Sequence, residues 1–291
     1  MRDLPGAIRG GLWMVAAALS FTLMTTLIRE VAQDIHPFEI GFFRAATNLV
    51  LMLPYAFRTG PDIFRSSNHK IYIFRALFGF SFLMTYFPGA ATIPVSDSQA
   101  LIFSSPLFAC AMAIVFLGER VRARRVTALI VGFCGAVLIL RPGFDTVSMG
   151  ALLVLVGAFV NAAANVMVRH TTRTDHPDTA VFYLMLYVTP LAAIPALFVW
   201  TTPTLTQLAF LVAIGFCGSL NQRFTSRAFA AAEATAILPF DFARLPFAAI
   251  IGWIVFAELP DIWVWAGGAL VFGSSLYIAH REAKAAKEEA D

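Results

Sequence analysis

Long apolar stretches separated by short polar breaks follow one another along the whole chain. Each has close to the roughly 20 residues that an α-helix needs to cross the hydrocarbon core of a bilayer. We mark ten, at residues 10–28, 38–57, 71–88, 96–117, 124–140, 149–168, 179–200, 206–226, 232–256 and 262–280. The breaks carry turn residues and charges, and none could hold a soluble domain. The pattern predicts an all-α integral membrane protein with ten transmembrane helices and a solvated tail at 282–291.

The positive charges are distributed unevenly between alternate breaks. With a cytoplasmic N-terminus, sixteen Lys and Arg residues fall on the cytoplasmic side, and only Arg29 and Arg141 fall on the other. Cytoplasmic loops of membrane proteins carry such an excess. We therefore expect both termini to be cytoplasmic. The three remaining arginines, Arg44, Arg75 and Arg244, lie within apolar stretches.

The composition excludes a soluble protein, because 59% of the 291 residues are hydrophobic and 13% are charged, whereas soluble domains have about 25% charged residues. The net charge of +3 then reflects sidedness in the membrane, and we expect no nucleic-acid partner. The three cysteines match no zinc or disulfide spacing. Walker, zinc-protease and serine-hydrolase motifs are missing from the sequence. We expect no metal, no cofactor, no catalytic residue and no enzymatic activity.

The two halves of the chain carry related segments. In each half a polar segment leads into an apolar stretch that contains a proline and ends at a glutamate. These residues are Pro106 and Glu119 in the first half and Pro246 and Glu258 in the second. We expect both glutamates to mark helix ends and to be structural.

This repeat predicts two five-helix units, at residues 1–145 and 146–281. Because five is odd, the second unit must cross the membrane with the opposite orientation. Inverted repeats allow one site to open alternately to each side of a membrane. The sequence thus favours a secondary transporter that works by alternating access.

Three segments resemble a known family. The stretch Pro-Phe-Glu-Ile-Gly-Phe-Phe-Arg at 37–44, the Pro-Leu-Phe and Leu-Gly-Glu pattern within 106–119 and its counterpart at 246–258 are similar to those of EamA-type transporters of the drug/metabolite transporter superfamily. The resemblance implies an exporter of amino acids, including aromatic ones, or of related small metabolites, in a bacterial inner membrane. The second half has Ala257 before Glu258 where glycine is usual, and we expect little consequence because alanine is small.

Asp241 and Arg244 are the clearest candidates for a substrate site. Charges within a bilayer are costly and mark a cavity or a partner. The two residues are three apart, on one face of the predicted ninth helix, and lie between Pro239 and Pro246. Arg244 would bind a substrate carboxylate beside Asp241. Alternatively, the two form a structural ion pair that binds no cargo.

Other polar and aromatic residues complete the predicted substrate site. Arg44 could bind an anion, or only pack against its neighbours. Uncharged polar residues could bind a cargo, or hold helices together; they are Asn161, Asn165, Asn221, Gln222, Gln99 and Ser104. Aromatic residues could form an apolar wall, or contact lipid or pack in the core; they are Trp13, Phe78, Phe82, Tyr86 and Phe103.

We expect a monomer whose partners are the lipid bilayer and a small-molecule substrate, an amino acid or a similar amphipathic metabolite. An exporter of drugs or of nucleotide-related metabolites with the same fold is the alternative within this class. A channel or an intramembrane enzyme is the alternative from a different class.

Overall fold

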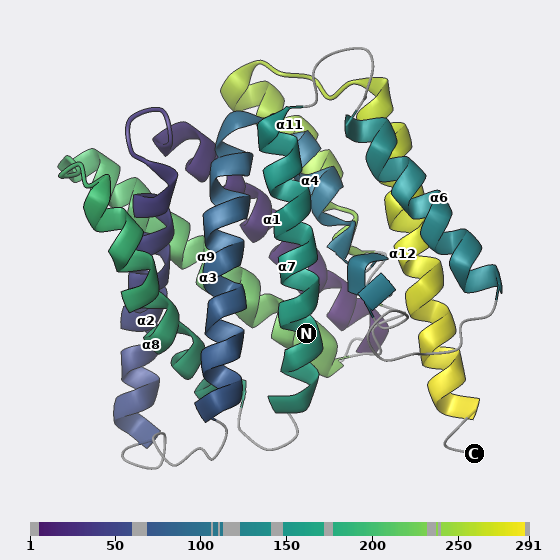
Figure 1. Ribbon diagram of the computed structural model, residues 1–291, viewed down its shortest axis with the longest axis horizontal. Helices are drawn as coiled ribbons and strands as arrows, with labels where there is room; N and C mark the ends of the chain where they lie inside the picture. Colours follow the sequence, from purple (N-terminus) through teal and green to yellow (C-terminus); the bar gives the residue numbers. More distant parts are fainter. Residues whose placement is uncertain are drawn as a thin grey trace.

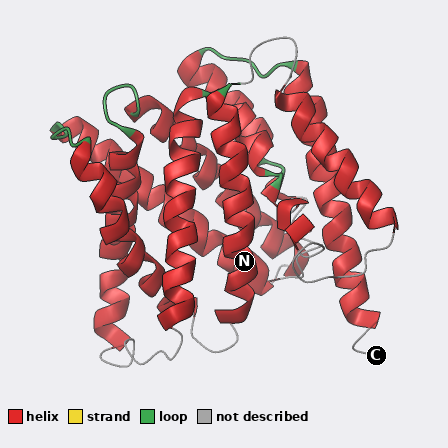
Figure 2. Cartoon of the chain, viewed as in Figure 1, coloured by secondary structure: helices red, strands yellow, loops and turns green. Residues whose placement is uncertain are grey.

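Helices account for all the regular secondary structure of the described chain (Figure 2). The computed structural model describes residues 6–59, 69–105, 107–109, 111–112, 123–140, 148–171, 177–231, 237 and 240–288. Its helices are α1 (Gly6–Val31), α2 (Pro37–Thr59), α3 (His69–Thr92), α4 (Val95–Ile102), α6 (Ala123–Leu140), α7 (Met149–Thr171), α8 (Pro177–Phe198), α9 (Leu205–Ala231), α11 (Arg244–Phe256) and α12 (Ile262–Glu288). The prediction of an all-α fold is confirmed.

Local sequence explains where several helices begin. Pro37 and Pro177 are the first residues of α2 and α8, a position at which the missing N–H of proline costs no helical hydrogen bond. Thr204 and Gln207 form a capping box before α9, because the Gln207 carboxamide oxygen accepts the Thr204 N–H at 2.8 Å and the Thr204 hydroxyl accepts the Gln207 N–H at 3.3 Å.

Four helices of the described chain are long and apolar enough to cross a membrane, over Ile8–Val31, His69–Thr92, Val181–Phe198 and Leu205–Phe229. Shorter apolar helices cover Ile130–Ile139, Met149–Ala164, Arg244–Phe256 and Ile262–Ser274. Many large apolar side chains on these helices are exposed, for example Phe198 at 85% and Ile254 at 71%. Such a surface is suited to lipid rather than to water.

The helices pack in pairs that repeat between the two halves (Figure 1). The contact of α1 with α9 is matched by that of α7 with α3, and the contact of α1 with α11 by that of α7 with α4. The pairs α2–α8 and α6–α12 lie at opposite sides of the molecule (Figure 1). This reciprocal packing is what an internal two-fold repeat of five spans produces.

Two predicted spans, 96–117 and 232–256, are not continuous helices. The first is interrupted after α4, where Phe103 and Ser104 form a turn and the Ser104 N–H bonds to the Leu101 carbonyl at 3.0 Å. The second is interrupted just before α11, where the Leu245 N–H bonds to the Phe242 carbonyl at 3.1 Å. Both tight turns precede a proline, whose missing N–H cannot continue an α-helical ladder.

Glycines let α6 and α12 approach closely. A side chain at Gly135 would meet the Gly267 carbonyl oxygen at 2.8 Å, and one at Gly267 would meet the Gly135 carbonyl oxygen at 2.6 Å. Small residues at such crossings allow the backbones of membrane helices to touch. By contrast, a side chain at Gly273 on α12 would meet no atom within 4 Å.

Ala257 ends α11 in a left-handed conformation, with φ 55° and ψ 28°. Glycine is favoured at this helix-ending position because a Cβ atom is strained there. Alanine at this position therefore has a conformational cost that glycine would not have.

Candidate functional site

The interruptions of the two broken spans face each other inside the molecule. The Phe103 ring, at the end of α4, lies 6.1 Å from the Phe242 ring. The Arg244 guanidinium, at the start of α11, lies 6.0 Å from the Phe103 ring. Discontinuous helices in transporters commonly surround substrate and ion sites, because only there can irregular backbone be tolerated in a membrane.

Asp241 and Arg244 form an ion pair at this junction, with 2.8 Å between Arg244 Nε and Asp241 Oδ1. The two residues lie across a turn rather than on the face of one continuous helix, because α11 begins only at Arg244. Both side chains are largely buried, and the Arg244 guanidinium also lies 4.6 Å from the centre of the Phe21 ring on α1. Cation–π contacts of this kind stabilise a desolvated guanidinium.

Thr25 links three helices through its hydroxyl group. It donates to the Phe21 carbonyl at 3.0 Å, so it accepts hydrogen bonds from the Tyr86 hydroxyl at 3.0 Å and from Gln99 Nε2 at 3.1 Å. Thr25, Tyr86 and Gln99 are all completely buried. The ring of Phe82 stacks on Tyr86 at 4.9 Å. This network fixes the Tyr86 hydroxyl among α1, α3 and α4.

Arg44 approaches the same tyrosine from α2. Its guanidinium lies over the Phe87 ring at 5.8 Å, and both Arg44 and Arg244 are close enough to Tyr86 to interact with it electrostatically. Gly218 on α9 makes room for it, because a side chain there would meet Arg44 Nε at 3.2 Å.

We call the following residues the central site, since they come together from both halves of the chain: Phe21, Thr25, Arg44, Tyr86, Gln99, Phe103, Ser104, Asp241 and Arg244. Within it, Arg44 Nε, Gln99 Oε1 and Ser104 Oγ are buried and have no hydrogen-bond partner in the described part of the structure. A buried polar group left without a partner costs about 1–3 kcal/mol. Gln99 and Arg44 are linked through the contact of Thr25 with Tyr86, and Ser104 lies at the break after α4. These unpaired groups therefore mark a region able to bind polar groups of another molecule.

Some predicted site residues lie elsewhere and connect helices. Asn161 Nδ2 donates to Ser105 Oγ at 3.1 Å, and Asn221 Nδ2 donates to the Ala17 carbonyl at 3.0 Å. Trp13 stacks on Phe224 at 5.4 Å. These contacts match the alternative interpretation in which such residues hold helices together.

Two further predicted residues, Gln222 and Phe78, show no contact with the central site in the described part of the structure. Gln222 is exposed and Phe78 is half-buried. The side chain of Asn165 lies outside the described part of the structure, as does Glu119.

Sequence reasoning did not identify Phe21 and Thr25. Threonine and phenylalanine are ordinary in membrane helices, so neither stands out from its neighbours. The only available signal was the run of hydroxyl residues Thr22, Thr25 and Thr26 in an otherwise apolar stretch.

A second ion pair joins the ends of α1 and α11. Arg29 makes two hydrogen bonds to the Glu258 carboxylate, one of them at 2.6 Å, and its guanidinium lies 4.4 Å from the Phe256 ring. Glu258 marks a helix end, as expected, but it also pairs with a residue of the other half of the chain, which the sequence did not predict.

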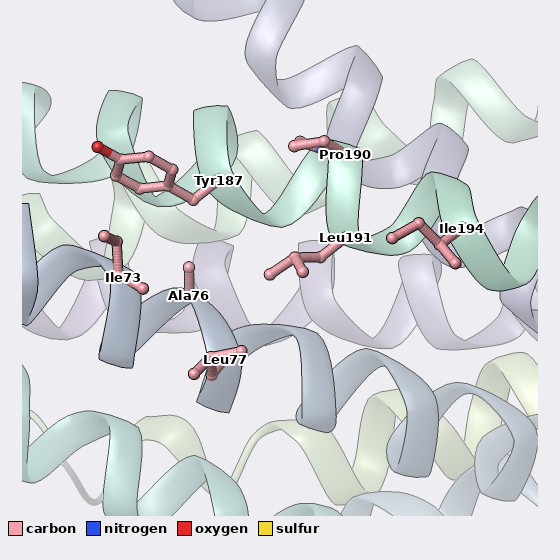
Figure 3. A pocket seen from close by; sticks show the side chains of 7 residues that line it. All are labelled: Ile73, Ala76, Leu77, Tyr187, Pro190, Leu191 and Ile194. Carbon is pink, nitrogen blue, oxygen red and sulfur yellow. The ribbon is translucent and has the colours of Figure 1, made fainter.

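Two grooves on the periphery are distinct from the central site. One, of about 360 Å³, lies between α3 and α8; Figure 3 shows its lining of Ile73, Ala76, Leu77, Tyr187, Pro190, Leu191 and Ile194. Ile73, Leu77 and Ile194 are each more than 40% exposed, as for a lipid-facing surface. The other, of about 400 Å³, lies between α6 and α12.

Comparison with known proteins gives a family match over most of the chain. The model of the EamA-like transporter family matches residues 8–141 and 148–279. A solved crystal structure that is 16% identical superposes with a TM-score of 0.64, covering 94% of this chain and 98% of the other. At that identity the superposition supports the fold alone.

The relatives are named as transporters of different compounds. A riboflavin transporter of Vibrio cholerae is 30% identical, covering 97% of this chain and 96% of its own length. The pseudopaline exporter CntI of Pseudomonas aeruginosa is 32% identical, covering 90% and 93%. An S-adenosylmethionine uptake transporter of Rickettsia bellii is 28% identical, covering 94% of each chain.

Proposed function

The chain belongs to the EamA-like transporter family, as a multi-pass membrane protein that transports small metabolites, and on this premise we propose that it moves its cargo by alternating access through the central site. The observation that supports this most is that the two broken spans meet at Phe103 and Arg244, and that Gln99 Oε1 on α4 and Ser104 Oγ at the first break are buried without hydrogen-bond partners in the described part of the structure. A cargo that supplies hydrogen-bond partners would offset their desolvation cost. Since the site draws on both repeats, a change in their relative orientation would change its access.

We propose that the cargo is an amino acid, in the first place an aromatic one, or a related small metabolite. The aromatic residues Phe21, Tyr86 and Phe103 support a cargo with a planar part, because rings stack favourably in desolvated sites. The arginines support a cargo with hydrogen-bond acceptors. Riboflavin is the second candidate, since it is planar and rich in carbonyl groups, and since relatives of 29–32% identity are named riboflavin transporters.

Four further properties belong to the same proposal. The excess of Lys and Arg in alternate loops supports cytoplasmic termini. We propose a location in a bacterial inner membrane, a monomer as the working unit and export as the direction of net transport. The relatives include proteins named as exporters and proteins named as uptake transporters, so the direction needs its own measurement.

Counterflow in proteoliposomes tests the transporter function. Vesicles loaded with unlabelled tyrosine, tryptophan, riboflavin or S-adenosylmethionine should accumulate the same compound in labelled form, with saturation, for at least one of the four. Flux that rises linearly with concentration would favour a channel. Exchange that equals that of protein-free vesicles for all four would count against the proposed cargo classes.

A further inference from the structure

Arg44 and Arg244 differ in what balances their charge. Arg244 is paired with Asp241 at 2.8 Å and contacts the Phe21 and Phe103 rings. Arg44 has no carboxylate within ion-pair distance among the described residues. Its guanidinium contacts the face of Phe87, and its Nε atom, like that of Arg244, is buried without a hydrogen-bond partner in the described part of the structure, so the difference lies in the missing carboxylate. The central site thus carries one positive charge that nearby described side chains do not neutralise.

Two other buried charged residues of the first half form no ion pair with Arg44 in the described part of the structure. Glu39, also on α2 and completely buried, accepts a hydrogen bond from the Thr201 backbone N–H at 3.0 Å through Oε2, and its Oε1 has no hydrogen-bond partner there. Arg75 on α3 interacts electrostatically with Tyr72. A desolvated guanidinium without a counter-charge is costly, and charges in a membrane interior occur where they bind a ligand or a partner.

The surroundings of Arg44 hold it in place. Gly218 provides the space for its Nε atom, since a side chain there would approach to 3.2 Å. One turn further along α2, Asn48 accepts a hydrogen bond from Ser219 on α9 at 3.0 Å. The Asn48–Ser219 hydrogen bond thus holds α2 against α9 one turn from the guanidinium.

We propose that Arg44 is the residue that binds a carboxylate group of the cargo, while the Asp241–Arg244 pair contributes no net charge to recognition. This deepens the proposed function and rests on it. A guanidinium binds a carboxylate through two parallel, charge-assisted hydrogen bonds. The aromatic rings would then contact the remainder of the cargo. The preferred cargo is therefore a carboxylate that also has a planar or apolar part, and a neutral molecule of the same shape should bind more weakly.

A matched pair of ligands tests this assignment in the purified full-length protein. Indole-3-acetate and indole-3-acetamide have the same ring and nearly the same shape, and only the first is an anion. Microscale thermophoresis should show about tenfold tighter binding of the carboxylate, as expected for one charge-assisted pair. The variant Arg44→Gln should abolish this preference and Arg44→Lys should retain part of it. Arg223→Gln, at an exposed arginine of α9, should not change it.

Equal affinity for the two ligands, no binding of either, or a preference that survives in Arg44→Gln would overturn the assignment. Its failure can be separated from failure of the transporter function. Saturable counterflow by the wild type together with equal affinity for the two indole ligands would leave the transporter function in place and overturn only the role of Arg44.

The Arg29–Glu258 pair carries a second, independent inference. Arg29 lies four residues after Thr25, on the same face of α1 and one turn beyond the central site. Its paired hydrogen bonds to Glu258 hold the end of α1 against the end of α11. α1 and α11 provide Thr25 and Arg244 to the central site, so separating these two helix ends requires the pair to break.

We propose that the Arg29–Glu258 pair is a latch that closes the central site on the non-cytoplasmic side. In the sequence the repeat-related glutamate is Glu119, and Arg169 lies near the end of α7 as Arg29 lies near the end of α1. The repeat therefore has an arginine and a glutamate at the corresponding positions, which could form an equivalent pair on the opposite side of the membrane.

The rate of thiol labelling in the central site reports whether the latch is closed, and this test does not require the cargo to be known. A reporter cysteine is introduced by Phe21→Cys, in a protein whose three native cysteines are alanine. Sulfonatoethyl methanethiosulfonate, which does not cross membranes, is added outside spheroplasts. Glu258→Gln should raise the labelling rate about fivefold or more, and the exchange Arg29→Glu with Glu258→Arg should restore a slow rate. Glu30→Gln, at the exposed neighbour of Arg29, is the matched control. The proposal would be overturned if Glu258→Gln were labelled at a rate within about twofold of the rate of the reporter protein that keeps Glu258.

Discussion

The Phe103 ring and the Arg244 guanidinium, which lie 6.0 Å apart, join the interruptions of two repeat-related helices. Phe103 ends α4 in the first half, and Arg244 begins α11 in the second. A contact between the two breaks means that any movement of one half against the other rearranges the central site. This relationship is the structural basis of the following predictions.

Replacing Arg244 separates recognition from folding. Arg244→Ala leaves Asp241 buried without its partner, and breaking a buried pair costs about 3–5 kcal/mol. We expect loss of counterflow together with a lower melting temperature. The double variant Asp241→Leu with Arg244→Met removes both charges, so it should regain stability and still not transport. Recovery of transport in the double variant would show that the pair is structural only.

Ala257→Gly should stabilise the protein. The left-handed backbone at this position, with φ 55°, costs alanine about 1 kcal/mol relative to glycine. The greater freedom of glycine in the unfolded chain offsets part of this gain. We expect a net gain of about 0.5 kcal/mol in the free energy of unfolding, measured by titration with SDS in mixed micelles. A loss of stability would contradict the left-handed end of α11.

The crossing of α6 and α12 should not tolerate a side chain at Gly267. Gly267→Leu would place atoms against the Gly135 carbonyl oxygen, which already lies 2.6 Å from an added Cβ, so the helices must separate and lose packing. We expect a lower melting temperature and a lower yield of folded protein. Gly273→Ala on the same helix, where an added Cβ meets nothing within 4 Å, is the control and should behave as the wild type.

Tyr86→Phe removes one donor from the Thr25 hydroxyl and leaves the Gln99 bond in place. The lost hydrogen bond joins two neutral groups, and such a bond contributes less than a bond to a charged group. We therefore expect the free energy of unfolding to fall by about 1 kcal/mol. We also expect the cargo to bind more weakly, because the variant keeps the aromatic ring but loses the hydroxyl group as a polar contact. Thermal unfolding and binding of indole-3-acetate measure the two effects. Unchanged affinity would place the Tyr86 hydroxyl outside the recognition surface.

The sequence predicted site residues best where a charged side chain lies in an apolar stretch, because a charge is costly in the membrane interior. Asp241, Arg244 and Arg44 were found because charges within apolar stretches are rare, and the two repeats were found from their prolines and glutamates. The prolines also marked the spans that turn out to be broken. The positions of the breaks were not predictable, because they depend on which carbonyls find new donors, such as Phe242 accepting from Leu245.

Other parts of the site depend on helix packing, which periodicity does not determine. Thr25 is important because Tyr86 and Gln99 come from other helices to bond it. Asn221 was a reasonable candidate by composition, but it contacts a backbone carbonyl of α1 instead. Arg29 follows the apolar stretch at 10–28 and was therefore expected in a break, whereas it lies in the last turn of α1, and only the fold brings it to Glu258.

Transport through the central site is tested most directly by counterflow in proteoliposomes that contain wild-type, Arg244→Ala or Arg223→Gln protein at equal, verified density. The structure predicts saturable exchange of at least one labelled compound among tyrosine, tryptophan, riboflavin and S-adenosylmethionine, retained in Arg223→Gln and lost in Arg244→Ala. Exchange by Arg244→Ala at the wild-type rate would contradict transport through this site.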